Sequence, residues 1–235
     1  MGRIFEKRKH KMFARFDRMS KQFTKLGKEI AMAVKQSGPL PENNPRLRLA
    51  IQMAKAVNMP KDRIDGAIKR ASSKDEKDHE ELSYDGKGPY GIAFVIECAT
   101  DNTTRTVNNI RMHFNRGGGE LGKIGSNDYL FDRKGVFRIK AAGMNYDELE
   151  LEGIDHGLEE LMTDEDELVL YTDFSHFGAM QKFLEEKKAE IVSAEKQRIP
   201  QTTIDLSEEQ AAEVLALVER FEEDDDVQAV YTNLA

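Results

Sequence analysis

The chain has 235 residues, of which 39% are hydrophobic and 33% are charged, and its formal net charge is -8 at pH 7. This length allows one large domain or two to three small ones, and no segment approaches the roughly 20 apolar residues of a membrane-spanning helix. A single cysteine, Cys98, excludes an internal disulfide and a cysteine zinc cluster, so we expect a cytoplasmic protein. The basic start lacks the apolar core of a secretory signal, and Glu6 stands where myristoylation requires Ser or Thr.

Charge is segregated along the chain. Residues 1–73 carry 18 Lys and Arg against 6 Asp and Glu, a net charge of +12, whereas residues 74–235 carry 17 against 37, a net charge of -20. A basic segment in an acidic chain predicts a polyanionic partner for that segment. The alternative is that the two parts attract each other within the molecule.

The N-terminal segment has two predicted parts. Residues 1–15 are predicted to form a basic arm that orders when it meets phosphate. Residues 16–36 predict an amphipathic helix. Its apolar face holds Phe16, Met19, Phe23, Leu26, Ile30, Ala33 and Val34. Its opposite face holds Arg18, Lys21, Lys25, Lys28 and Lys35. Solvated helix faces usually mix charge signs, so this single-sign face indicates contact with nucleic acid.

Two shorter helices follow. Asn44 and Pro45 have the residue types of an N-cap and a first helical position, and a third helix is predicted for residues 61–71. Together the three helices predict a bundle in residues 1–80. Short helices beside a basic face also fit a helix-turn-helix domain, for which the spacing alone is weak evidence. A polar linker is expected at residues 72–81.

The next segment combines a buried strand at residues 90–99, a helix at 101–116 and a glycine-rich loop ending at Ser126. This arrangement can present backbone groups to phosphates or to a partner, or it can be an ordinary surface helix with a mobile loop. Gly117, Gly122 and Lys123 match part of a P-loop, but Ile124 replaces the required hydroxyl and the loop follows a helix, which excludes that motif. The candidate contacts here are Arg105, Arg111, Arg116, Gly117, Gly118, Gly119, Lys123 and Ser126.

Residues 129–201 predict the order β-α-β-β-α-β of a ferredoxin-like domain. Its first strand, at residues 129–140, could also be a hairpin around Arg133. After it, residues 202–206 and 227–231 predict strands on either side of a helix with a capping box that begins at Ser207. We expect residues 81–128 and 202–235 to form a split α+β domain around the insertion at 129–201.

Catalytic and metal-binding patterns find little support. The histidines are scattered at positions 10, 79, 113, 156 and 176 and form no metalloprotease motif. Glu222 to Asp226 could bind a cation weakly, but a solvated acidic loop is the favoured interpretation, and Cys98 fits a small core residue. The sequence therefore predicts a protein that is not an enzyme and has no cofactor and no metal.

The predicted nucleic-acid contacts lie in the basic segment. They are Arg3, Lys7, Arg8, Lys9, Lys11, Arg15, Arg18, Lys21, Lys25, Lys28, Lys35, Arg46, Arg48, Lys55 and Lys61.

The chain resembles the YebC/PmpR family over essentially its whole length. The matching motifs are FTKLGKEI (Phe23 to Ile30), NPRLR (Asn44 to Arg48), AKAVNMPKD (Ala54 to Asp62), TDN (Thr100 to Asn102), NRGGGELGKIGS (Asn115 to Ser126) and YTD (Tyr171 to Asp173). The start departs from the family's commoner AGHSKW opening, and Asn127 replaces a frequent Val.

The resemblance implies an α+β protein with one helical and two α+β domains, and a non-enzymatic, cytoplasmic regulator. Family members are described as DNA-binding transcriptional regulators, and others as ribosome-associated factors that assist translation of difficult sequences such as proline runs. We expect a monomer that binds DNA or ribosomal RNA, with the ribosome as a further candidate partner and no membrane.

Overall fold

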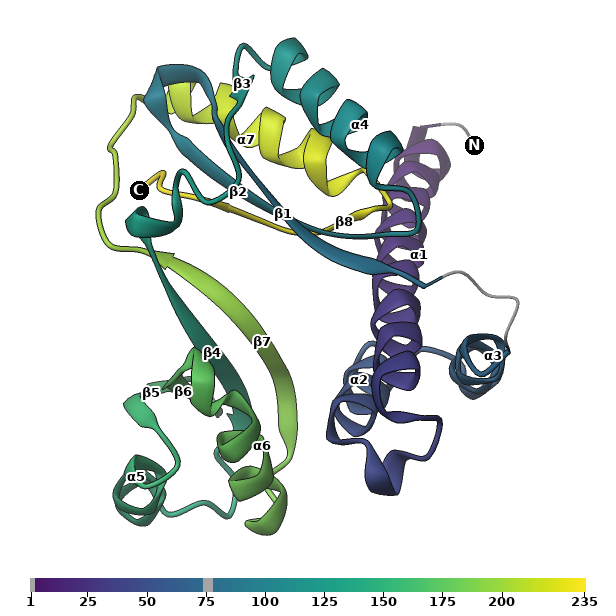
Figure 1. The fold of residues 1–235 in the computed structure, drawn as a ribbon, viewed down its shortest axis with the longest axis vertical. Coiled ribbons are helices and arrows are strands. Elements are labelled where there is room, and N and C mark those ends of the chain that lie inside the picture. Colours follow the sequence, from purple (N-terminus) through teal and green to yellow (C-terminus); the bar gives the residue numbers. More distant parts are fainter. Residues whose placement is uncertain (1–2, 74–77) are drawn as a thin grey trace.

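The structure is a computed structural model that describes residues 3–73 and 78–235, with side chains described from residue 19 onward. Its units surround a central opening in the view of Figure 1. Among the described residues, no helix has both the length and the apolar character to cross a membrane.

The helical unit consists of α1 (Arg3–Ser37), a short turn η1 (Pro41–Asn43), α2 (Pro45–Ala56) and α3 (Lys61–Ala71). The prediction of a separate arm at residues 1–15 was wrong, because α1 is continuous from Arg3. Residues 3–26 contain neither glycine nor proline, so nothing in the chain interrupts propagation of the helix toward its start.

The start of α2 has the predicted cap. The Asn44 side chain accepts a hydrogen bond from Leu47 N at 3.0 Å and donates one to the Ala33 carbonyl at 2.7 Å. Asn44 is buried, so this one side chain both begins α2 and fixes it to the end of α1. The core of the unit is formed by apolar residues of all three helices, including Ile30, Leu47 and Ile64.

The first sheet has the strand order β3-β1-β2-β8 and antiparallel neighbours. Its elements are β1 (Glu80–Lys87), η2 (Pro89–Gly91), β2 (Ala93–Thr100), α4 (Thr103–Arg116), β3 (Glu120–Leu121), η3 (Asp128–Leu130), α7 (Glu208–Glu222) and β8 (Val227–Thr232). The helices α4 and α7 pack on one face of it (Figure 1), around the buried rings of Phe94, Phe114 and Phe221.

Two predictions for this unit were wrong. The segment expected as a linker, residues 72–81, includes the first two residues of β1, which begins at Glu80 and continues to Lys87. Residues 202–206 form no strand and contribute only one bridge, between Ile204 and Leu234. Asp205 and Leu206 lead directly into the capping box of Ser207 at the start of α7, so the chain turns into the helix before a ladder can form.

The second sheet has the order β5-β6-β4-β7, also with antiparallel neighbours. Its elements are β4 (Phe131–Lys140), α5 (Tyr146–Ile154), β5 (Leu158–Asp164), β6 (Glu167–Asp173), η4 (Phe174–His176), α6 (Phe177–Glu186) and β7 (Ile191–Pro200). The predicted β-α-β-β-α-β order is confirmed, and residues 131–140 are one strand rather than a hairpin. The α+β fold class is confirmed as well, while the domain boundaries stay predictions.

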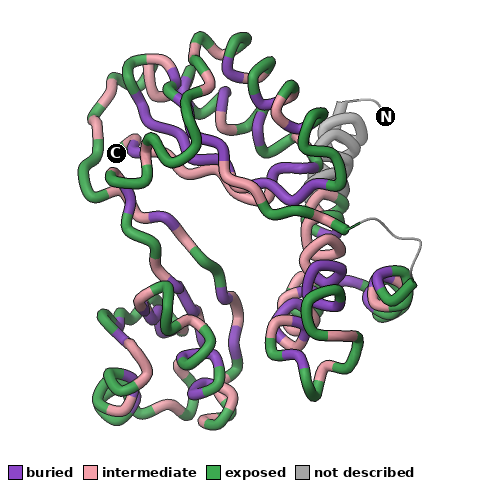
Figure 2. Tube along the Cα trace, viewed as in Figure 1, coloured by how far each residue is buried: buried purple, intermediate pink, exposed green. Residues whose placement is uncertain are grey.

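The helical unit contacts both sheets. Leu49 and Met53 of α2 join the core of the second sheet, and Arg48 pairs with Glu185 of α6 at 2.9 Å. Buried residues accordingly concentrate inside each unit and along these junctions (Figure 2). The upper half of α1 runs beside the first sheet (Figure 1), which brings its basic face against the C-terminal part of the chain.

Candidate nucleic-acid interface

Three lysines on the predicted basic face of α1, Lys21, Lys25 and Lys28, contact the loop between α7 and β8 or the start of β8. Lys21 lies 4.0 Å from Glu223, and the Lys25 ammonium donates to the Gln228 carbonyl at 3.1 Å. Burial lowers the pKa of Lys25, and the neighbouring ammonium of Lys21 acts in the same direction. This face is therefore in contact with the molecule's own acidic loop.

Lys28 makes the closest of these contacts. Its ammonium donates to the Ala99 carbonyl at 3.0 Å, the Asp225 carbonyl at 2.7 Å and the Asp226 carboxylate at 2.9 Å. An ammonium has three donors, so all of them are used. The Lys28 side chain is 14% exposed and that of Asp226 is 6% exposed, which makes this a buried ion pair between α1 and the loop after α7.

The other oxygen of Asp226 binds α4. It accepts hydrogen bonds from Arg105 Nη2 at 2.7 Å and Thr106 Oγ1 at 3.0 Å, and from Thr100 Oγ1 at 3.2 Å. Burial raises the pKa of Asp226, but the donors of Lys28 and Arg105 together outweigh it and lower the pKa to about 2. Arg105, predicted as a loop contact, thus helps to fix a buried carboxylate.

The acidic segment Glu222 to Asp226 is solvated only in part, because Glu222, Glu223 and Asp225 are exposed whereas Asp226 is buried. Asp224 accepts from Asn109 at 3.0 Å and lies 3.5 Å from His113, so two of its carboxylates join α1 and α4 to the strand β8. Within the described residues there is no group of three or more metal-ligating side chains. Attraction between the basic and acidic parts, the alternative weighed above, is observed at this junction.

Three other predicted contacts have partners inside the molecule. Arg46 forms a bidentate pair with Glu29, at 2.7 and 3.1 Å, and also binds Glu81 at 2.6 Å. Burial lowers the pKa of Arg46, but these two carboxylates outweigh it and raise the pKa above its ordinary value. Lys35 lies 3.0 Å from Asp78, and Arg48 binds Glu185 as described above.

A second set of cations is exposed on α2 and α3. Lys55 and Lys61, both predicted, are exposed, as are Arg63, Lys69 and Arg70 of α3, which the sequence analysis missed. No carboxylate of the described chain pairs with any of these five side chains. The signal that could have found them is the exposed face of α3 itself, KDRIDGAIKR, where four cations meet two carboxylates.

Part of the predicted site lies outside the side chains that the structure describes. These residues are Arg3, Lys7, Arg8, Lys9, Lys11, Arg15 and Arg18.

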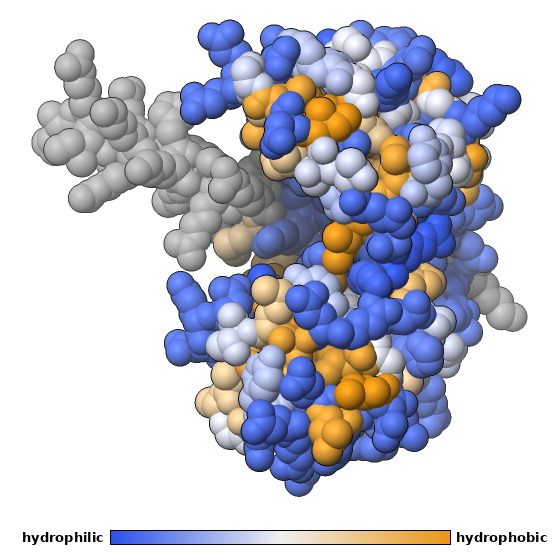
Figure 3. Space-filling view, turned by 90° about the vertical axis from the view of Figure 1, so that its left-hand side faces the viewer, coloured by the Kyte–Doolittle hydropathy of each residue, from blue (hydrophilic) through white to orange (hydrophobic). Residues whose placement is uncertain are grey.

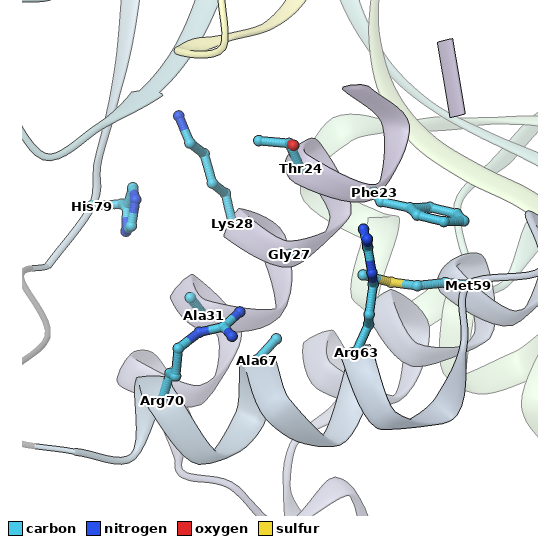
Figure 4. A pocket seen from close by; sticks show the side chains of 10 residues that line it. All are labelled: Phe23, Thr24, Gly27, Lys28, Ala31, Met59, Arg63, Ala67, Arg70 and His79. Atoms are coloured by element: carbon cyan, nitrogen blue, oxygen red, sulfur yellow. The ribbon is translucent and has the colours of Figure 1, made fainter. Parts of the chain in front are cut away.

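A basic pocket of about 440 Å³ lies between α1 and α3 (Figure 4). Its cationic lining residues are Lys28, Arg63 and Arg70. The other lining residues are His79 and apolar, small or hydroxyl-bearing residues, with no carboxylate. A neighbouring hollow of about 350 Å³ is lined by Lys35 and Arg46 but also by Asp78 and Glu81. Of the two, the pocket on α3 has the charge that suits an anion.

The glycine-rich loop is packed against the first sheet. A Cβ atom on Gly117 would lie 2.6 Å from Leu217 Cδ1, and one on Gly119 would lie 2.5 Å from the Lys87 carbonyl oxygen. Gly118 has a φ of 74° and open space around it. At the end of the loop, the Asn127 amide donates to the carbonyls of Gly86 and Phe94. The short distances to a Cβ atom show that close packing accounts for Gly117 and Gly119.

The remaining loop candidates are exposed. Arg111, Arg116, Lys123 and Ser126 all lie at the surface, beside Ile124, which is 72% exposed. The loop follows the C-terminal end of α4, whereas Arg105, near the start of α4, binds Asp226, the carboxylate that also binds Lys28 of α1. A 14-residue helix spans about 20 Å, so the structure does not bring the loop and the α1–α3 pocket together.

The far side of the molecule has a different character. In the lower half of Figure 3, hydrophobic surface gathers among hydrophilic side chains. Leu151 and Ile154 of α5 and Met162 of β5 are exposed. The helix α5, YDELELEGI, carries four carboxylates and no cation. This surface is unsuited to a polyanion, which leaves the helical unit as the candidate nucleic-acid interface.

Known protein families match this chain over nearly its whole length. The family described as "TACO1/YebC protein N-terminal domain" matches residues 3–74, and "TACO1/YebC second and third domain" matches residues 79–234. A "Probable transcriptional regulatory protein" of Cytophaga hutchinsonii is 57% identical over 235 residues, covering 100% of this chain and 99% of the relative. Another of that name from Parabacteroides distasonis is 52% identical, covering 100% of this chain and 97% of the relative.

A solved structure shows the same architecture. The crystal structure of a conserved hypothetical protein from Aquifex aeolicus is 37% identical, with a TM-score of 0.78, and the match covers 92% of this chain and 90% of that one. Both family descriptions and the full-length relatives agree with the motifs found in the sequence. The chain belongs to the TACO1/YebC family.

Proposed function

We propose that this protein is a non-enzymatic, nucleic-acid-binding regulator of gene expression that contacts its target through the helical unit. The observation that carries the proposal is the cluster of exposed cations on α3, beside a pocket that no carboxylate lines. Exposed Lys and Arg side chains bind phosphates by releasing condensed counterions. The names of the curated relatives support a regulatory role, and DNA is the target that they favour.

Charge distribution favours a second candidate, a ribosome-binding translation factor. Residues 74–235 carry a net charge of -20, and the acidic helix α5 lies on a part of the molecule that a long wrapped duplex would approach. A folded RNA assembly needs to meet only the basic helical unit. In both candidate functions the cations of α3 supply affinity for phosphates. The two functions differ in the contacts that give specificity, to base edges in DNA or to the shape and unpaired bases of RNA.

The experiment that tests the proposal measures two targets across a salt series. Ribosome co-sedimentation is run beside a duplex DNA titration, with the full chain in both. Ribosome binding that survives about 150 mM salt while DNA binding is lost assigns a translation factor, since non-specific binding weakens steeply with salt. Sequence-selective DNA binding at that salt without ribosome association assigns a transcriptional regulator. Absence of binding to both, even at low salt, contradicts the proposal.

A further inference from the structure

We propose that the pocket between α1 and α3 binds one unpaired nucleotide, with the base stacked on the Arg63 guanidinium and the phosphate held by Arg70. This inference rests on the proposed function and adds the form of nucleic acid that the site selects. Nothing in the fold other than the helical unit is needed to build the pocket, whose lining comes from α1, α3, Met59 and His79.

The stacking surface is held in place by an aromatic ring. The Arg63 guanidinium carbon lies 5.6 Å from the centroid of the Phe23 ring, and Phe23 is 9% exposed in the core between the helices. The guanidinium therefore lies over the ring, while Arg63 as a whole is exposed. A planar guanidinium that is supported on one side offers its other side to a base, a recurrent arrangement in recognition of unpaired nucleotides.

The pocket is hollow because its floor has short side chains. Gly27 and Ala31 of α1 and Ala67 of α3 line it, and a Cβ atom on Gly27 would meet nothing within 4 Å. The volume of about 440 Å³ falls in the range of about 300 to 1,000 Å³ that is usual for small-ligand sites. The floor therefore leaves space for a group the size of a nucleotide.

The charge lies where a phosphate would be needed. Arg70 follows Arg63 by seven residues, about two helical turns, and in Figure 4 it lies at the opposite end of the pocket, on the same side as His79. The Lys28 nitrogen points away from the floor, toward its acceptors on the acidic loop. Arg70 is thus the exposed guanidinium available to a phosphate, and guanidinium groups bind phosphates in bidentate geometry.

An intact duplex cannot fill this pocket. In a duplex the base lies in the stack, and its removal from a paired position requires unstacking and unpairing energy. A bulged or single-stranded nucleotide avoids most of this energy. The pocket therefore predicts a preference for nucleic acid that presents an unpaired nucleotide.

The test uses the full chain and three RNA hairpins of one sequence: one with a single bulged adenosine, one fully paired, and one with an abasic bulge. Fluorescence anisotropy at about 100 mM salt gives the three affinities. Stacking of one base is expected to make the bulged hairpin bind about tenfold more tightly than the other two. Equal affinity for all three hairpins would contradict nucleotide binding in the pocket and would leave the proposed function unaffected. If no hairpin binds even at low salt, the pocket proposal fails, and the proposed function is decided separately by the duplex DNA and ribosome titrations.

Substitutions in the floor locate the effect. Gly27→Leu fills the pocket without a backbone clash, and Gly27→Ala is the matched control that changes helix propensity but little volume. Arg63→Lys keeps the positive charge and removes the planar guanidinium on which a base would stack. We expect Gly27→Leu and Arg63→Lys to lose the tenfold preference and retain binding of the paired hairpin, with Gly27→Ala like the original chain. A preference that survives Gly27→Leu would overturn the proposal.

Discussion

The Lys28 ammonium lies 2.9 Å from the Asp226 carboxylate, although 198 residues separate them in the sequence. This pair joins α1 to the loop that closes the first sheet, and Arg105 completes it from the other side. The basic face of α1 is consequently partly neutralised within the molecule. Among the described side chains of the helical unit, the cations that remain available to a polyanion are those of α3 and Lys55 of α2.

Replacement of Asp226 by Asn should destabilise the fold by about 3 kcal/mol, because two cationic groups would lose their buried counter-charge. The change keeps the shape of the side chain, removes its charge and replaces one acceptor oxygen by an NH2 donor. Chemical denaturation at about pH 7 measures the effect. The matched control is Asp225→Asn, because the Asp225 side chain is exposed and it is the backbone carbonyl of Asp225 that accepts from Lys28. Equal stability of the two variants would contradict the assigned role.

The same pair predicts a pH dependence. The folded protein lowers the pKa of Asp226 from 3.8 to about 2, since the donors of Lys28 and Arg105 outweigh the opposing effect of burial. A carboxylate whose pKa is lower in the folded than in the unfolded protein stabilises the fold at pH values above the unfolded-state pKa. This stabilisation is lost as the pH falls through the folded-state pKa. The stability difference between the original chain and Asp226→Asn should therefore shrink by about 2 kcal/mol from pH 5 to 2. If the stability difference stayed constant from pH 5 to 2, the assigned ionisation of Asp226 would be wrong.

Gly119→Ala should lower stability by about 1 to 3 kcal/mol, because the added methyl group would press on the carbonyl of Lys87 and require a backbone shift. Lys123→Ala in the same loop is the control, since Lys123 is exposed. Thermal unfolding of both variants measures the difference. If Gly119→Ala is as stable as the control, close packing is not the reason for this glycine.

Cys98 should resist thiol reagents in the folded protein. It is 2% exposed in β2, and burial raises the pKa of its thiol to about 12, with Asp224 and Asp226 acting in the same direction. The thiol is the reactive species only after ionisation. Mass spectrometry after alkylation at about pH 8 should show modification in denaturant and none without it. Rapid modification of the folded chain would contradict this assignment.

Local signals in the sequence predicted much of the fold. Asn44 and Asn102 cap α2 and α4 as their residue types indicate, and the order of elements in residues 131–200 follows from alternation and turn residues. The strand β1 was missed because it carries a buried carboxylate, Asp85, and a glycine, Gly86, against which Phe114 packs. Both residue types disfavour a strand in isolation, and only tertiary packing explains them.

The site was harder to predict for a physical reason. Helical periodicity shows that Lys21, Lys25 and Lys28 share a face, but it cannot show what that face meets. Their partners come from the loop after α7, at the other end of the chain. Arg63 and Arg70 were not predicted as contacts, and Asp62 and Asp65 lie on the same helix. The structure shows that neither carboxylate pairs with an α3 arginine among the described residues.

The most direct test of the account is the salt dependence of nucleic-acid binding by Arg63→Glu/Arg70→Glu, compared with Lys182→Glu/Lys188→Glu. Both double variants change the net charge equally, and Lys182 and Lys188 lie exposed at the second sheet. The account predicts that the α3 variant loses affinity and that its slope of log affinity against log salt falls by about 1.5, as expected for two lost phosphate contacts. The control should keep the original slope. Equal behaviour of the two variants would contradict the assignment of the interface to α3.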